Sequence, residues 1–176
     1  KMQKFVRYTD TDGDGITYRT LPGEDPRGAY FVRGSGHNSK GVYTEDAVEY
    51  QEVMERLLVK WNTAKKLVPA AVISRAKKPT RLGIVAFGSS DGAVVEARDQ
   101  LAAQGIHTDY LRLRGFPFGA EVLDFLHQHD TVFVVEQNRD AQMKSLLKLE
   151  TNNVADKLVS ILHFNGLPIP GSCVVE

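Results

Sequence analysis

Residues 82–105 read LGIVAFGSSDGAVVEARDQLAAQG, and this stretch decides the fold class. Its first six residues are apolar and rich in branched side chains, which is typical of a buried strand. The Gly-Ser-Ser at residues 88–90 then makes a tight turn into an amphipathic helix, and Gly105 is suited to a left-handed cap at the end of that helix. The apolar face of the helix consists of Ala93, Val94, Ala97 and Leu101. We therefore expect a strand, a turn and a helix in succession.

The same alternation continues to the end of the chain. Residues 107–113 alternate as a strand, residues 118–128 have helical spacing, and residues 131–135 form an apolar strand. A further helix is expected at residues 139–150 and a last strand at residues 158–162. Strands that alternate with helices at this length predict crossover connections and an α/β fold, with a mostly parallel sheet covered by helices on both faces.

The first part of the chain has a different character. Residues 1–42 are dense in Gly, Asp, Pro and aromatic residues, which predicts an irregular arm. Thr44 is a candidate N-cap for a long amphipathic helix at residues 45–67, and Pro69 follows the end of this helix. Residues 74–80 carry several charges and Pro79, and they predict a solvated linker.

These patterns divide the chain into two parts. Residues 1–78 hold the arm, the long helix and the linker, whereas residues 79–176 form the α/β domain. The chain begins with Lys1 and enters a turn-rich stretch at once, so we expect it to have been cut from a longer protein.

Composition narrows the class of protein. Lys plus Arg and Asp plus Glu number 22 each, so the basic excess that favours nucleic acid is absent. No apolar run approaches the roughly 20 residues that a membrane helix needs, and we expect no membrane partner. Cys173 is the single cysteine and cannot form an internal disulfide or a metal cluster by itself, which favours a cytoplasmic location.

Three acidic residues near the start form a candidate metal site. Asp10, Asp12 and Asp14, followed by Gly15, match the first half of a calcium-binding loop, where alternating carboxylates converge on one cation. The twelfth loop position is Leu21 instead of a bidentate Glu, so an EF-hand is not predicted. Two interpretations remain, a simpler divalent-cation site and a set of turn-forming Asp-Gly residues.

The turn at Gly88, Ser89 and Ser90 is a candidate anion site. It follows a predicted strand and opens a helix, so its backbone amides could face a phosphate or a carboxylate. It lacks the glycine spacing of a dinucleotide fingerprint and the Gly-Lys-Ser/Thr of a phosphate loop. The alternative interpretation is a serine N-cap for the helix.

A second polar cluster follows the strand at residues 131–135. Glu136, Gln137, Asn138 and Arg139 lie where open parallel sheets place their binding crevices. We favour the competing interpretation, in which these residues cap the next helix and contact a partner subunit.

The loop from Arg33 to Asn38 joins a flexible glycine backbone to a cation and the imidazole of His37. Such loops can line active sites. The sequence offers no second His nearby and no Gly-x-Ser-x-Gly elbow, so a metal site or a hydrolase is not predicted. We expect no catalytic residue here and a structural or interfacial role for His37.

Residue strings along the whole chain resemble alpha subunits of 2-oxoacid:ferredoxin oxidoreductases. The strings are RY (7–8), DGDGI (12–16), YRTLPG (18–23), GAYF (28–31), RGSGHN (33–38), YTED (43–46), MERL (54–57), TAK (63–65), GSS (88–90), RGFPF (114–118) and VVEQNRDAQ (134–142). The subtype looks closest to the 2-oxoglutarate enzymes. The chain would then be the carboxy-terminal part of the alpha subunit, and residues 79–176 would resemble the carboxy-terminal domain of transketolases. In that domain one strand is antiparallel, and residues 158–162 are the candidate.

The resemblance implies an enzyme that decarboxylates a 2-oxoacid oxidatively, forms the acyl-coenzyme A and reduces ferredoxin. Thiamine diphosphate, Mg and an iron-sulfur cluster serve the complete enzyme, and they are held by parts that this chain does not include. The partners implied are a beta subunit, a second alpha-beta unit in a dimer, and ferredoxin. This part would serve subunit assembly and would be inactive alone. The alternative is a stand-alone anion- or nucleotide-binding α/β module.

Overall fold

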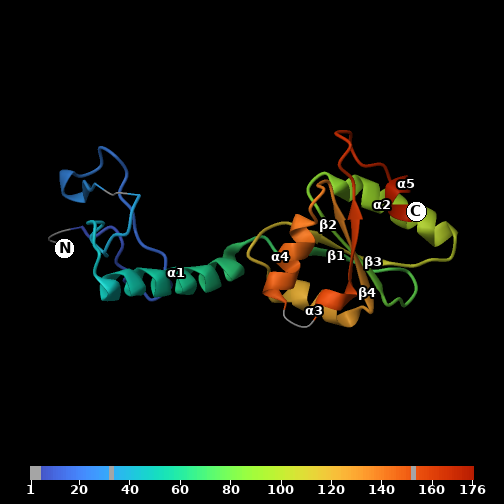
Figure 1. Ribbon diagram of the computed structural model, residues 1–176, viewed down its shortest axis with the longest axis horizontal. Helices are drawn as coiled ribbons and strands as arrows, with labels where there is room; N and C mark the ends of the chain where they lie inside the picture. Colours follow the sequence, from blue (N-terminus) through green and yellow to red (C-terminus); the bar gives the residue numbers. More distant parts are fainter. Residues whose placement is uncertain (1–4, 32–33, 152–153) are drawn as a thin grey trace. The chain divides into compact units, whose positions relative to one another are not determined.

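A computed structural model describes residues 5–31, 34–151 and 154–176, and the chain divides into two compact units. The units are Lys1–Leu67 and Val68–Glu176, and each is described here by itself (Figure 1). The division falls after Leu67, because Val68 and β1 (Val72–Ser74), which come before most of the segment expected to be a linker, belong to the second unit.

The first unit is built on α1 (Ala47–Leu67), and a short 3-10 turn, η1 (Pro26–Gly28), lies in the arm. The helix begins two residues later than the sequence predicts. The carboxylate of Asp46, and not Thr44, accepts hydrogen bonds from two amides of the first helical turn, at 2.9 and 3.0 Å. Thr44 instead accepts a hydrogen bond from the Asp46 amide.

The arm packs on α1 through the backbone at Gly15. Gly15 has φ +79°, and a Cβ at this position would collide with the backbone of Lys60. Arg56 Nη1 donates to the Gly15 carbonyl at 2.7 Å, and Thr63 Oγ1 donates to the Asp14 carbonyl at 2.6 Å. Only a residue without a side chain lets the arm approach the helix this closely.

The second unit holds a five-stranded sheet with strand order β1-β3-β2-β4-β5. The strands are β1 (Val72–Ser74), β2 (Leu82–Phe87), β3 (Asp109–Leu113), β4 (Thr131–Glu136) and β5 (Leu158–Leu162). β2, β3, β4 and β5 pair in parallel, and β1 pairs antiparallel with β3. The expectation that residues 158–162 form the antiparallel strand is therefore wrong, since that role falls to β1 at the opposite edge.

Helices cover both faces of the sheet, as the sequence predicts (Figure 1). α3 and α4 lie on one face, whereas α2 and α5 lie on the other. The helices are α2 (Ser90–Ala103), α3 (Ala120–Gln128), α4 (Gln142–Glu150), α5 (Ser172–Val175) and the 3-10 turn η2 (Ala155–Lys157). Among the described residues, none of the helices combines the length and the apolar character that crossing a membrane requires.

Neighbouring residues of β2 face opposite cores. Val85 packs in the core beneath α3 and α4, whereas Ile84 and Ala86 pack in the core beneath α2 and α5. All three side chains are at most 2% exposed. Burying a side chain of the size of Val or Ile stabilises a fold by about 1.5–3 kcal/mol. The continuous apolar run of β2 is therefore required by a sheet that is buried on both sides.

We expect Gly83→Ala to destabilise the second unit. A Cβ at Gly83 would lie 2.9 Å from Phe125 and 3.2 Å from His129. Such overpacking typically costs about 1–3 kcal/mol. The control is Gly92→Ala, because Gly92 lies on the exposed side of α2 and a Cβ there meets nothing within 4 Å. That control should gain up to about 1 kcal/mol from helix propensity. Urea unfolding of the two variants measures both changes, and an equal effect of the two substitutions would contradict the packing.

Candidate functional site

The structure brings together the two polar loops that the sequence singles out in the second unit. They follow β2 and β4, which are neighbours at the point where the strand order reverses. Gln137 Nε2 donates to Ser89 Oγ at 3.0 Å and to Ser90 Oγ at 3.1 Å. Ser89 occupies the N-cap position of α2, as the alternative interpretation expects, but its side chain makes no capping hydrogen bond to the helix. Its hydroxyl instead ties the turn at Gly88 to the loop after β4.

Glu136 is fully buried and caps α4. Its Oε2 accepts hydrogen bonds from the Met143 amide at 2.6 Å and from Asn138 Nδ2 at 2.8 Å, and its Oε1 accepts from the Lys144 amide at 3.0 Å. A carboxylate at a helix N-terminus also interacts favourably with the helix dipole. The expected capping of the next helix is thereby confirmed for Glu136, whereas contacts to a partner subunit stay a prediction.

The loop before α4 explains why this helix begins at Gln142 and not at residue 139. Asn138 Oδ1 accepts hydrogen bonds from the amides of Asp140 and Gln142, at 3.1 and 3.3 Å. Ala141 has φ 51°, in the left-handed region. Arg139 forms an exposed ion pair with Asp140 at 2.7 Å. Arg139 is thus on the surface and away from the hydrogen bonds that join Gln137 to Ser89 and Ser90.

The candidate metal loop of the first unit is held by its own backbone. Asp10, Asp12 and Asp14 bring carboxylate oxygens within 4.8 Å of one another. Asp10 accepts hydrogen bonds from the amides of Gly13 and Gly15, at 2.9 and 2.8 Å. Asp14 accepts a hydrogen bond from the amide of Ile16. Burial raises the pKa of Asp10, but these amide donors lower it by more, so that pKa lies below its ordinary value. The turn interpretation accounts for these contacts, and a cation site stays a prediction.

His37 lies in a cavity of about 480 Å³ between the arm and α1. Its ring stacks on Tyr8, with the ring centroids 4.2 Å apart, and its Nδ1 lies 3.0 Å from the Asn38 carbonyl oxygen. Arg7, Arg56 and Lys60 also line this cavity. Arg33, the other predicted residue of this loop, lies outside the described residues.

These cationic side chains serve the packing of the arm. Arg7 Nη1 donates to Thr17 Oγ1 at 2.8 Å, and Arg56 binds the Gly15 carbonyl. Arg7 also lies over the ring of Tyr8, 4.7 Å from its centroid. The expected structural role of His37 agrees with these contacts, although the cationic lining would also attract an anion.

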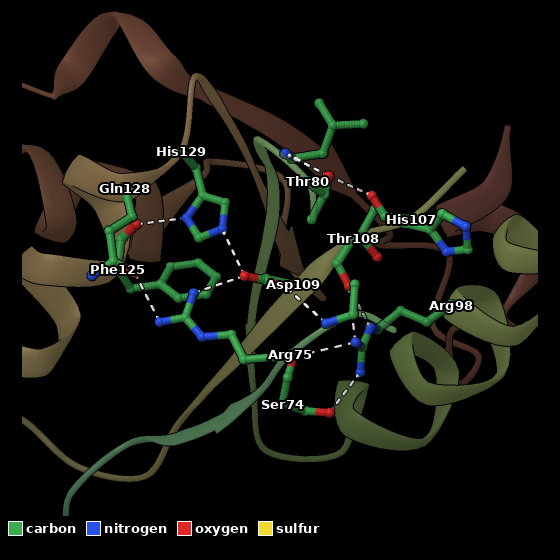
Figure 2. A network of polar contacts seen from close by, with 12 residues as sticks. Ser74, Arg75, Thr80, Arg98, His107, Thr108, Asp109, Phe125, Gln128 and His129 are labelled. Carbon is green, nitrogen blue, oxygen red and sulfur yellow. Dashed lines mark hydrogen bonds and ion pairs between the residues drawn. The ribbon is translucent and has the colours of Figure 1, made fainter. Parts of the chain in front are cut away.

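Sequence reasoning missed a buried polar network around Asp109 (Figure 2). Asp109 Oδ2 accepts a hydrogen bond from Arg75 Nη1 at 2.7 Å, and its Oδ1 accepts from the Ala76 amide at 2.7 Å. His129 Nε2 lies 3.2 Å from Asp109 Oδ2, and His129 Nδ1 lies 2.6 Å from the Phe125 carbonyl oxygen. A charged residue within the strand predicted at residues 107–113 is the signal that could have revealed it.

This network fixes the segment after β1 to the start of β3. Arg75 belongs to the stretch that the sequence analysis assigns to a solvated linker, but its guanidinium also donates to Gln128 at 2.8 Å. Burial raises the pKa of the Asp109 carboxyl, but the hydrogen bonds from Ala76, Arg75 and His129 lower it by more. The pKa of Asp109 therefore lies below its ordinary value, and Asp109 stays ionised near neutral pH.

We expect Asp109→Asn to lower the free energy of unfolding at pH 7 by about 1–3 kcal/mol, because hydrogen bonds to a charged group are lost. A carboxyl whose pKa is depressed by folding stabilises the protein above its unfolded pKa, and this contribution is lost as the pH falls through the folded pKa. The difference between wild type and variant should therefore shrink below about pH 4. Urea unfolding between pH 3 and pH 7 measures it.

Asp130→Asn is the control for this experiment. Asp130 pairs with Arg81 at 2.7 Å, but both side chains are about two-thirds exposed, at 64% and 65%. Water screens such a pair, so its loss should change stability much less. If both variants lose the same free energy of unfolding, the buried hydrogen bonds of Asp109 stabilise the protein no more than an exposed ion pair does.

The candidate cation loop and Cys173 are the groups of this chain that bear on the cofactors implied by the resemblance. Among the described residues, Asp10, Asp12 and Asp14 are the one group of three or more potential metal ligands within 4.8 Å of one another, and their oxygens already accept hydrogen bonds from the loop. Cys173 is the single cysteine, whereas an iron-sulfur cluster normally takes four thiolates. No step involving thiamine diphosphate, Mg or a cluster is derived from these residues.

Comparisons with known proteins agree on one family. No family model matches the chain. The alpha subunit of 2-oxoacid:ferredoxin oxidoreductase 1 from Sulfurisphaera tokodaii is 31% identical over 170 residues, which cover 93% of this chain and 25% of that subunit. The alpha subunit of 2-oxoacid:ferredoxin oxidoreductase 2 from Aeropyrum pernix is 28% identical over 160 residues, 89% of this chain and 24% of that subunit.

A solved structure shares the fold. The 2-oxoglutarate:ferredoxin oxidoreductase from Magnetococcus marinus aligns with 98% of this chain and 30% of its own, with a TM-score of 0.83 and 22% identity. The chain spans about a quarter of the length of the curated relatives it matches. Over most of its length, the chain is a homologue of the alpha subunits of 2-oxoacid:ferredoxin oxidoreductases.

Proposed function

We propose that this chain is part of the alpha subunit of an enzyme that converts 2-oxoglutarate, coenzyme A and oxidised ferredoxin into succinyl-CoA, CO2 and reduced ferredoxin. The observation that carries the proposal is the similarity to alpha subunits over 93% of the chain. The substrate is supported by the Magnetococcus marinus structure, which was solved with 2-oxoglutarate, coenzyme A and succinyl-CoA bound. Thiamine diphosphate, Mg and an iron-sulfur cluster are proposed to lie in parts of the enzyme outside this chain.

The role proposed for this part is subunit assembly. Its partners would be the beta subunit and a second alpha-beta unit, and ferredoxin would meet the assembled complex. The apolar side chains of α1 support this role, because one helix residue, Val53, is buried while many large apolar neighbours are exposed. Large apolar side chains that stay exposed in a folded protein can form an interaction site. The exposed side chains include those of Val48, Leu58, Val59 and Leu67.

We expect the isolated 176-residue chain to show no turnover of 2-oxoglutarate. The reason is that the cofactors of the reaction are proposed to be held by other parts of the enzyme, so supplying thiamine diphosphate and Mg to this chain should give no turnover. The assay measures reduction of ferredoxin in the presence of coenzyme A, and the complete enzyme is the positive control. Turnover by the chain alone would contradict the assembly role, and a complete enzyme that accepts other 2-oxoacids but not 2-oxoglutarate would contradict the proposed substrate.

We expect Leu58→Glu in the complete alpha subunit to reduce its association with the beta subunit. Leu58 is 67% exposed on α1, and a charge at an apolar contact is costly to bury. Asn62→Glu places the same charge one turn further along the same face of α1 and tests how far the contact extends. Sedimentation of the co-expressed subunits measures the fraction of complex.

Thermal unfolding of the variant alpha subunit alone separates two outcomes. An unchanged midpoint together with less complex supports a contact to the beta subunit. A lowered midpoint would show that Leu58 packs within the alpha subunit itself, and unchanged association would likewise contradict the proposed surface.

A further inference from the structure

A second cavity, of about 240 Å³, lies within the second unit beside the edge of the sheet. Three segments form it: the residues after β1, the residues that lead into β3, and the later half of α2. The polar residues that line it are Ser74, Arg75, Lys77, Arg98, Asp99, His107 and Thr108. Figure 2 shows Ser74, Arg98, His107 and Thr108 gathered between β1 and α2.

The lining is cationic. Arg75, Lys77 and Arg98 contribute positive charge and His107 an imidazole, against the single carboxylate of Asp99 among the lining residues that the structure describes. Arg75 is already paired with Asp109, so it is the charges of Lys77 and Arg98 that remain for a ligand.

Arg98 donates its hydrogen bonds to neutral acceptors. Its Nε and Nη2 donate to the Thr108 carbonyl at 3.1 and 2.8 Å, and its Nη1 donates to Ser74 Oγ at 3.0 Å. Within the described part of the chain it forms no ion pair with a carboxylate. Burial lowers the pKa of Arg98, and the charges of Asp109 and Asp99 partly oppose this shift. A half-buried guanidinium without a direct counter-ion favours the entry of an anion.

Two further polar atoms of this lining are buried without a partner. Thr108 is 5% exposed, and its Oγ1 has no hydrogen-bond partner among the described residues. The same holds for Nε2 of His107. An unsatisfied buried polar atom is costly, and native proteins rarely keep one without a reason. Both residues line the cationic cavity, but neither atom is open to it in the free protein, so a ligand meets them only after the side chains of the lining move.

We propose that this cavity binds a phosphate group. A hydroxyl, an imidazole and two cationic side chains approach it from three separate segments. A phosphate group presents several acceptor oxygens in different directions, whereas a carboxylate presents two in one plane. The phosphate group belongs either to the free inorganic ion or to a small phosphate monoester. The site lies away from the hydrogen bonds that join Gln137 to Ser89, and it uses residues to which the proposed enzyme activity assigns no role.

Titration calorimetry of the full 176-residue chain tests this site. The ligands are inorganic phosphate, sulfate and glycerol phosphate, a simple monoester, each at constant ionic strength. Saturable binding of one phosphate per chain is expected. Tighter binding of the monoester would assign the site to an organic phosphate, and equal or weaker binding would assign it to the free ion. Absence of saturable binding of any of the three would overturn the proposal.

Two variants with matched controls locate the binding. Lys77→Gln should weaken phosphate binding several-fold, whereas Lys78→Gln removes the same charge from the neighbouring residue, which does not line the cavity, and should change it little. Thr108→Val should weaken binding by about tenfold through the loss of one hydrogen bond to a charged group. Equal effects of the two lysine variants would show general attraction by the surface and would contradict a defined site.

Thr108→Val also has a readout without phosphate. The Thr108 hydroxyl has no partner in the free protein, so replacing it with a methyl group should leave the unfolding midpoint unchanged or raise it slightly. A lowered midpoint in the absence of phosphate would mean that the hydroxyl is already satisfied by water or by another group. That result would remove the main reason to place a ligand at Thr108 and would overturn the proposal.

Discussion

Burial of the central strands on both faces is the constraint on which the second unit depends. β2 lies between β3 and β4, and helices cover both of its faces. The middle of β2 therefore carries the apolar side chains of Ile84, Val85 and Ala86. Gly83 has no side chain because a Cβ there would collide with Phe125. Because these strands cannot shift register without exposing their apolar side chains, the loops at their ends are held in fixed positions.

Fixed strand ends bring distant segments into contact. At one end of the sheet, Gln137 reaches the turn at Ser89 and Ser90, while Glu136 caps α4. At the opposite end, Asp109 joins Arg75 and His129, which lie before and after it in the sequence. Both sets of contacts satisfy buried polar groups, as a low-dielectric interior requires. Glu136 and Gln137, which the sequence suggests as ligand contacts, thus make hydrogen bonds that stabilise the fold.

The first unit depends on a different kind of contact. Its arm has few regular elements and is held on α1 by backbone carbonyls that accept hydrogen bonds from Arg56 and Thr63. α1 itself buries little of its apolar surface within this unit. The relatives are about four times as long as the part they share with this chain.

The sequence by itself determined β2 to β5 and α2 to α4, because their apolar residues form continuous runs or recur at helical spacing, whereas it predicted neither β1 nor α5. It also carried the resemblance to alpha subunits of 2-oxoacid:ferredoxin oxidoreductases, through strings of residues spread over both units. Only the tertiary structure decided that β1 and not β5 is antiparallel, that Asp46 and not Thr44 caps α1, and that Asp109, Arg75 and His129 meet. Strand direction and contacts between distant side chains are set by how the elements pack, and the spacing of apolar residues along the chain does not specify that packing.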